Sequence, residues 1–238
     1  MDKGDKMKVF CISDLHLDLT GSKPMNIFGE SWDNYLEEIE KDWQAKVSDE
    51  DLVLISGDIS WAMKLEDFKK DIEYLNKFKG KKVLNRGNHD YWWNSITKVR
   101  SILPSNMYAL QNDYIKFDNI IICATRGWEL PERNEEPTEE MEKMLNREYI
   151  RCELSLSSMQ KQRKEGDVVI FMIHYPPFNS TRQQNPFLDL FEKYKVDIVV
   201  YGHLHGTNLR ATLYEERNGI KYYLTSCDQV HNKLTQII

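Results

Sequence analysis

Short unbroken apolar runs alternate along the chain with longer segments whose apolar residues recur every three or four positions. The runs predict buried strands at residues 8–13, 51–56, 82–85, 119–124, 167–173 and 196–201. The periodic segments predict amphipathic helices at residues 32–46, 65–78, 92–103 and 138–166. We also expect a strand around residues 108–117 and a hairpin of 213–217 with 220–224, turned by Asn218-Gly219. Strands and helices in this alternation indicate an α/β protein with parallel strands.

The composition favours one folded domain. Of the 238 residues, 41% are hydrophobic, which is enough to build a large core. No linker rich in Pro, Gly or Ser and no repeat divides the sequence, so we expect residues 1–238 to form a single domain. The apolar runs are too short for a membrane, and the first residues are charged rather than signal-like. Four cysteines without paired spacing favour a reducing compartment, so we expect a cytoplasmic protein.

The charge balance limits the kinds of partner. A net charge of -6 argues against general binding to a nucleic-acid backbone, although it leaves room for a local cationic site for one phosphate. We therefore expect a small anionic substrate rather than a nucleic acid or a membrane. The sequence does not predict an oligomeric state.

Residue types that bind metal ions follow five of the predicted strands. They are Asp14 and His16, then Asp58, then Asn88 and His89, then His174, and last His203 and His205. Each pair alone is ordinary loop chemistry, but five of the six histidines stand at these strand ends. Because the carboxyl ends of parallel strands meet at one edge of a sheet, these side chains can converge into a metal site.

These five blocks, in this order, resemble the signature of the calcineurin-like metallophosphoesterases over about residues 8–205. The resemblance implies an α/β fold of two packed mixed sheets flanked by helices, in four layers, with two divalent metal ions at one edge. It implies that one metal is bound by Asp14, His16 and His205, that the other is bound by Asn88, His174 and His203, and that Asp58 bridges them. It also implies that His89 acts beside the metals as a general acid. Mixed nitrogen and oxygen ligands suit Mn, Fe, Zn or Co better than Ca.

The implied function is a metal-dependent phosphoesterase that hydrolyses a small phosphodiester or nucleotide-like phosphate ester through a metal-activated hydroxide. The alternatives are a phosphomonoesterase, a protein phosphatase and a metal-binding scaffold without catalysis. The scaffold is disfavoured because no ligand type and no acid is missing. Protein phosphatases of this superfamily carry an Asp-Arg pair three and four residues after the bridging aspartate, where this chain has Trp61-Ala62. A metallo-β-lactamase-like hydrolase would need a compact cluster of ligands on one loop, which the sequence lacks.

The segment Arg126-Gly127-Trp128 allows two interpretations. It can place a guanidinium group and an indole beside the metals to bind a nucleotide-like substrate, under an irregular loop at residues 19–33. Alternatively, Trp128 packs under the long charged helix and Arg126 pairs with one of its glutamates. Trp61 likewise is either a specificity residue or a packing residue.

Overall fold

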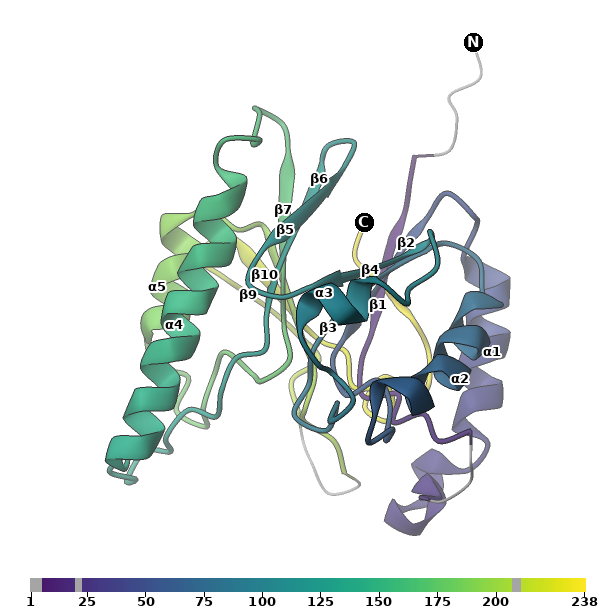
Figure 1. Cartoon of the computed structure of the whole chain (residues 1–238). Helices are drawn as coiled ribbons and strands as arrows, with labels where there is room; N and C mark the ends of the chain where they lie inside the picture. Colours follow the sequence, from purple (N-terminus) through teal and green to yellow (C-terminus); the bar gives the residue numbers. More distant parts are fainter. Residues whose placement is uncertain (1–5, 20–22, 207–210) are drawn as a thin grey trace.

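Two mixed β-sheets lie face to face, and helices cover their outer sides (Figure 1). The computed structural model describes residues 6–19, 23–206 and 211–238. The first sheet has the strand order β11 (Thr235–Gln236), β1 (Val9–Ile12), β2 (Leu52–Ser56), β3 (Lys81–Asn85) and β4 (Met107–Leu110). The second has the order β5 (Tyr114–Phe117), β6 (Ile120–Thr125), β7 (Val168–Ile173), β8 (Ile198–Tyr201), β10 (Ile220–Leu224) and β9 (Tyr214–Arg217). The arrangement confirms the predicted two-sheet α/β sandwich.

Helices form the two outer layers. The helices connected to strands of the first sheet are the short 3-10 helices η1 (Met25–Phe28) and η2 (Glu30–Trp32), followed by α1 (Tyr35–Lys46), α2 (Leu65–Asn76) and α3 (Ile96–Arg100). The second sheet is covered by α4 (Glu139–Met159) and α5 (Pro186–Lys193) (Figure 1). Within the described residues, no helix is both long enough and apolar enough to cross a membrane.

The inner strands are buried on both faces, which explains why they are apolar at nearly every position. In β1, Val9 and Cys11 face the layer between the sheets, whereas Phe10 and Ile12 face the layer beneath α1 and α2. The strands of the second sheet repeat this division, with Ile170 and Met172 pointing inward and Phe171 pointing toward α4 and α5. Three apolar layers therefore alternate with the two sheets.

Several predicted elements differ in extent from the structure. The helix expected at 138–166 ends at Met159 as α4, and the one expected at 32–46 begins at Tyr35 as α1. The helix expected at 92–103 is limited to α3, because the preceding Trp92 and Trp93 turn inward and are buried. The strand expected at 108–117 divides into β4 and β5, which belong to different sheets. Asn112 lies between them with a left-handed φ of 63°, so the chain changes direction there.

Two elements were not predicted. The helix α5 begins with recognisable signals, because the side chain of Asn185 accepts a hydrogen bond from the Phe187 N–H and Pro186 occupies the first turn. The strand β11 is only two residues long and pairs antiparallel to β1, with Cys11 opposite Thr235. No local pattern reveals such a short strand, since its pairing depends on a segment more than 200 residues away.

One lysine is fully buried within the first sheet. Lys82 in β3 has no exposed surface, and its ammonium group donates a hydrogen bond to the backbone oxygen of Phe78. Burial lowers the pKa of Lys82 to about 8, against a small opposing effect of Asp49. The folded protein therefore releases the proton of this lysine at a lower pH than the unfolded chain does.

This difference predicts a pH effect on stability. Between pH 8 and the ordinary lysine value of 10.5, the unfolded chain holds more protons at this site, so the destabilisation caused by burying Lys82 diminishes as the pH rises. Relative to Lys82→Met, the wild type should gain about 1–3 kcal/mol across this window. Urea unfolding at several pH values measures the difference. Lys79→Met, at an exposed lysine, is the control, and the stability of the wild type relative to this variant should not change with pH. If the wild type gains as much stability relative to Lys79→Met as relative to Lys82→Met, the effect does not come from Lys82.

Candidate metal centre

The seven candidate metal ligands come together at the carboxyl ends of parallel strands from both sheets. The first sheet supplies Asp14 and His16 after β1, Asp58 after β2 and Asn88 after β3. The second sheet supplies His174 after β7 and His203 and His205 after β8. The convergence expected from the strand ends is therefore present, while the metal-binding roles themselves stay a prediction.

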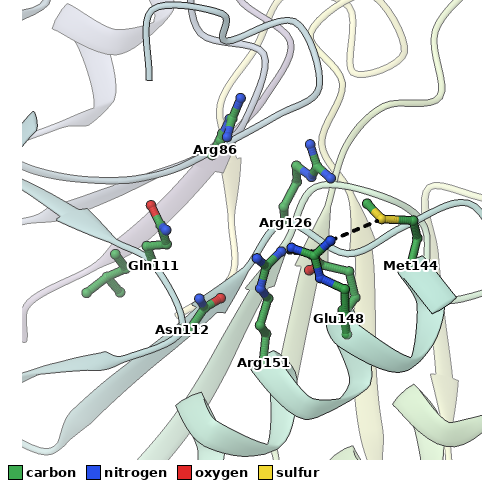
Figure 2. Close-up of a pocket in the computed structure, with 9 residues that line it drawn as sticks. Arg86, Gln111, Asn112, Arg126, Met144, Glu148 and Arg151 are labelled. Atoms are coloured by element: carbon green, nitrogen blue, oxygen red, sulfur yellow. Dashed lines mark hydrogen bonds and ion pairs between the residues drawn. The ribbon is translucent and has the colours of Figure 1, made fainter. Parts of the chain in front are cut away.

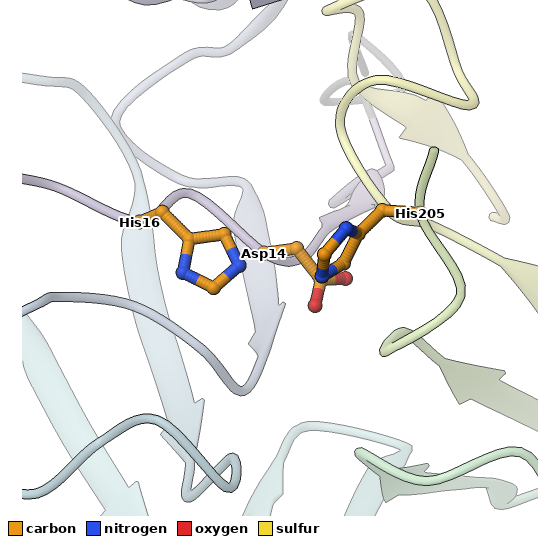
Figure 3. Close-up of side chains that lie close together, drawn as sticks. All are labelled: Asp14, His16 and His205. Atoms are coloured by element: carbon orange, nitrogen blue, oxygen red, sulfur yellow. The ribbon is translucent and has the colours of Figure 1, made fainter. Parts of the chain in front are cut away.

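The ligand types form two groups. In the first, one ligand atom each of Asp14, His16 and His205 lies within 4.8 Å of the others (Figure 3). In the second, Asp58, His174 and His203 meet the same limit. Each group contains the carboxylate and imidazoles that a transition-metal or zinc ion prefers, so each could hold one cation.

Asn88 belongs to the second group. Its amide oxygen lies 2.7 Å from Nε2 of His174 and 2.9 Å from Nδ1 of His203. Asp58 lies between the two groups, with Oδ2 3.4 Å from Nε2 of His174 and 3.9 Å from Nε2 of His16. This position is the one that a bridging carboxylate requires.

Several ligand atoms lack a partner within the protein. Both ring nitrogens of His16 and Oδ2 of Asp58 are buried, and among the described residues they have no hydrogen-bond partner. Buried polar atoms without partners destabilise a fold by about 1–3 kcal/mol each. Divalent cations between the two groups would satisfy these atoms, so the residues present fit a metal centre.

The protonation states agree with this fit. Burial lowers the pKa of His16 to about 3 and that of His203 to about 4, which leaves both imidazoles neutral at pH 7, the form that binds metals. His174 differs: burial alone would lower its pKa, but the negative charge of the nearby Asp58 carboxylate raises it to about 9. In the absence of a cation, a proton on His174 balances the carboxylates, and a cation bound there would displace it.

The backbone is strained at the candidate ligands. Asp14, His16, Asp58 and His203 have φ values of 57°, 44°, 49° and 72°, which residues other than glycine rarely adopt. Such conformations are unfavourable by roughly 1–2 kcal/mol each, and folded proteins keep them mainly where a site requires them. Four of the seven candidate ligands are therefore held in position by the surrounding structure against their local preference.

Two glycines allow the strand ends to approach one another closely. A Cβ atom on Gly87 would collide with the backbone and carboxylate of Asp58, and one on Gly202 would collide with Ser13 and the Asp14 carboxylate. No larger residue fits at either position without moving a candidate ligand. The glycines in the sequences Arg86-Gly87-Asn88 and Gly202-His203 thus serve the geometry of the site.

His89 lies beside the two groups. Its backbone N–H donates a 2.8 Å hydrogen bond to Asp58, and its half-buried ring lies 5.6 Å from the ring of His16. The Tyr91 hydroxyl lies 3.5 Å from its Nδ1. Trp61 stacks on His16 with ring centroids 4.8 Å apart and lies 4.7 Å from the ring of His89. Trp61 therefore packs directly on a candidate ligand, at the position that differs from the protein phosphatases.

The described part of the 19–33 loop also reaches the site. The ring of Trp32 lies 5.9 Å from that of His16 and 6.1 Å from that of His205. Residues 20–22 of this loop lie outside the described residues. The described part therefore packs a tryptophan against the exposed side of the first ligand group.

Both interpretations of residues 126–128 receive partial support. Trp128 packs against the apolar layer beneath α4, as the packing interpretation predicts. The Arg126 guanidinium stacks on the Trp128 ring at 4.7 Å, and within the described chain it forms no ion pair with a glutamate. Arg126 instead lines a cavity, so the two residues have separate roles.

Asp90 follows His89 in the loop after β3 and is buried beside the site. Its buried carboxylate accepts hydrogen bonds from Ile59 N (2.9 Å), Ser60 N (3.2 Å) and Trp92 Nε1 (3.0 Å) on one oxygen and from Gly87 N (2.8 Å) on the other. Burial raises the pKa of Asp90 to about 6, so the group is mainly ionised at neutral pH. Asp90 fastens the loop after β2 to the loop after β3. Its place directly after Asn88 and His89 in the sequence marks Asp90 as a residue near the site, but its hydrogen bonds are seen only in the folded structure.

Asp90→Asn should weaken metal binding without removing a ligand. An amide replaces one accepting oxygen with an N–H₂ group that faces a backbone or indole donor, so the two loops should separate. We expect a loss of about 10–100-fold in metal affinity and about 1–3 kcal/mol of stability, measured by metal titration and urea unfolding. Asp118→Asn is the control, because Asp118 is exposed in a turn with a φ of 48° that asparagine tolerates. Unchanged metal affinity in Asp90→Asn would refute this role.

Comparison with known proteins agrees with this geometry. The family model described as calcineurin-like phosphoesterase matches residues 7–207, and no curated protein matches the chain. Phosphopantetheinyl hydrolase from Mycobacterium tuberculosis is 12% identical with a TM-score of 0.60, covering 99% of this chain and 97% of that one. The protein TT1561 of Thermus thermophilus is also 12% identical with a TM-score of 0.60, covering 97% of each chain. At such identities these likenesses show a shared fold, whereas the family match extends over most of the sequence: the chain belongs to the calcineurin-like phosphoesterase family.

Proposed function

We propose that this protein is a binuclear metal-dependent phosphodiesterase that hydrolyses a small phosphodiester or nucleotide-like phosphate ester. Membership of the family supports metal-dependent hydrolysis of phosphate esters in general. The observation that supports the narrower proposal is the pair of candidate ligand groups, with Oδ2 of Asp58 3.4 Å from His174 in one and 3.9 Å from His16 in the other, and with His89 beside them. A scaffold without catalysis is disfavoured because no candidate ligand and no acid is missing.

The proposed metal ligands are the seven residues at the strand ends. Asp14, His16 and His205 would hold one divalent cation, Asn88, His174 and His203 the other, and Asp58 both. When bound, the cations supply positive charge at the phosphoryl group and lower the pKa of nearby water. Only two carboxylates face them, since the remaining ligands are neutral, and the centre keeps a net positive charge that attracts an anionic ester.

His89 is proposed to act on the leaving group. Its ring packs beside His16 and belongs to neither group, its backbone N–H is bonded to Asp58, and the Tyr91 hydroxyl lies 3.5 Å from its Nδ1. During hydrolysis the bond between phosphorus and the leaving oxygen breaks, and water provides the new oxygen on phosphorus. A protonated His89 can donate its proton to the leaving oxygen, which then departs as an alcohol rather than as an alkoxide.

Trp61 and Ala62 favour a diester over a phosphoprotein. The indole of Trp61 packs on His16 and lies beside His89, where protein phosphatases of the superfamily carry an acidic residue and an arginine. The acidic partner that would orient the acid histidine and the arginine that would bind a doubly charged monoester are therefore replaced. A planar ring at this place suits an organic substituent of an ester better than a charged peptide.

The cysteines support a reducing setting, and we propose the cytoplasm. Cys11, Cys123, Cys152 and Cys227 are all buried and unpaired. Burial raises the pKa of each thiol, so none is activated for disulfide exchange.

A substrate panel tests the proposed function. With manganese added, bis(p-nitrophenyl) phosphate should be hydrolysed with a kcat/KM about tenfold or more above that for p-nitrophenyl phosphate, and a phosphopeptide should be poorest. Exhaustive chelation should abolish activity, and saturation should restore it with about two metal equivalents per chain. A preference for the phosphopeptide, activity that survives chelation, or less than about one equivalent at saturation would overturn the proposal.

The role of His89 predicts a dependence on the leaving group. His89→Ala should lower kcat by about a hundredfold for a phenyl ester of thymidine 5′-phosphate and much less for the p-nitrophenyl ester, because p-nitrophenol departs without a proton. Metal content should stay the same. His231→Ala removes an exposed histidine outside the site and serves as the control. Equal losses with both esters would exclude an acid role, and loss of metal would make His89 a ligand.

A further inference from the structure

Four arginines from three separate elements line a cavity of about 210 Å³ (Figure 2). Arg86 comes from the loop after β3, Arg126 follows β6, and Arg147 and Arg151 lie one turn apart on α4. Among the described lining residues, Glu148 carries the only carboxylate. The cavity therefore has a formal charge of +3 in a chain whose net charge is -6.

Both oxygens of the single carboxylate, that of Glu148, already have partners within the protein. Glu148 has no exposed surface, and its Oε1 forms an ion pair with Arg151. Its Oε2 accepts hydrogen bonds from the hydroxyl of Thr125 (3.0 Å) and the backbone N–H of Gly127 (3.2 Å). Glu148 is therefore paired with Arg151 and fixes the end of β6, and within the described residues it forms no ion pair with the other three arginines.

Those three arginines have weak partners or none. Nη1 of Arg147 lies 3.6 Å from the sulfur of Met144, and Arg126 stacks on the Trp128 ring. Nε of Arg86 is shielded from solvent, and no described residue accepts a hydrogen bond from it. Within the described ranges, none of the three forms an ion pair. Guanidinium groups held together without a counterion repel one another, so an anion in the cavity would stabilise this arrangement.

The cavity is built on the same loops as the metal centre. Arg86 precedes Asn88 by two residues in the loop after β3. The backbone oxygen of Arg126 accepts hydrogen bonds from the N–H groups of His174 (3.0 Å) and Tyr175 (3.1 Å). The ring of Tyr175 lies 4.3 Å from that of His203 and 5.8 Å from that of Trp128. The loops that carry Arg86 and Arg126 are therefore bonded to, or continuous with, the loops that carry the candidate ligands Asn88 and His174.

We propose that this cavity binds a second phosphate of the substrate, distinct from the phosphate that is hydrolysed. The inference rests on the proposed function and narrows it to small phosphodiesters that carry a further phosphate group. Guanidinium groups donate paired hydrogen bonds to phosphate oxygens, and three uncompensated groups match a doubly charged phosphate. The volume suits a phosphate with a few waters, since whole small-molecule sites usually measure about 300–1,000 Å³. The rest of the substrate would then lie toward the metals.

Two chromogenic esters with one leaving group test the proposal. Thymidine 5′-(p-nitrophenyl phosphate) has only the scissile phosphate, and its 3′-phosphorylated form adds the second one. The wild type should prefer the 3′-phosphorylated ester by about tenfold or more in kcat/KM, mainly through KM. Arg86→Gln/Arg147→Gln should bring this ratio close to one. The control is Lys161→Gln, which removes a charge just beyond α4 but does not line the cavity, and it should keep the preference.

A binding measurement on the full chain separates this inference from the proposed function. After chelation, inorganic pyrophosphate should bind to the wild type and to Lys161→Gln with similar affinity. Its affinity for Arg86→Gln/Arg147→Gln should be lower by about tenfold or more. If the wild type hydrolyses neither ester, the proposed function fails and the substrate assignment falls with it, while this titration still decides whether the cavity binds phosphate. Pyrophosphate binding without a kinetic preference would mean that the cavity holds a free anion. Binding of a hexaglutamate peptide but not of pyrophosphate would make it a protein-docking site, and either result overturns the proposal.

Discussion

The candidate centre depends on the alignment of the two sheets, because each sheet supplies part of both ligand groups. The apolar layer between the sheets holds them together, and polar bonds at the edge fix their relative position. The backbone N–H of His203 donates to both carboxylate oxygens of Asp14, at 3.1 and 3.0 Å, and the ring of His174 lies 3.0 Å from the backbone oxygen of Ser56. Each of these bonds joins one sheet to the other. A small slide between the sheets would therefore separate both groups at once, since close-packed layers do not deform gradually.

Several unfavourable features of this fold occur together at the same edge. Four candidate ligands have a left-handed backbone, buried polar atoms have no hydrogen-bond partner among the described residues, and guanidinium groups gather around one carboxylate. Most of the fold away from this edge follows the rules of stable packing, with apolar residues on both faces of the strands and capped helices such as α4, where Thr138 accepts a bond from Met141. The buried Lys82 and the left-handed Asp118 are exceptions. Local violations that are offset by good packing elsewhere mark the places where a protein binds or reacts. The metal centre and the arginine cavity are two parts of one such region.

The sequence allowed the architecture to be predicted because most strands are short apolar runs that end in Gly, Asp or His. It could not define the segment between residues 92 and 117, since the burial of Trp92 and Trp93 and the turn at Asn112 depend on the layers that the chain joins. Within the site, residue types at strand ends predicted which ligands meet. The bonds of Asp90 and the grouping of Arg86 with Arg147 could not be predicted, because helix α4 and the loop after β3 meet only in three dimensions. Patterns of residue type identify the strand ends. Which other residues face those strand ends depends on contacts between segments that are far apart in the sequence.

The short strand β11 affects the order in which the protein can be completed during synthesis. It pairs with β1, and just before it Cys227 donates its backbone N–H to Ser13 and its thiol to the backbone oxygen of Asp14. The loop that carries the first two ligands thus takes its shape from residues translated more than 200 positions later. A nascent chain that ends before Cys227 contains Asp14 and His16 but lacks the bonds that this segment makes to Ser13 and Asp14. The loop of the first candidate ligand group is therefore completed only by the last part of the chain to be synthesised.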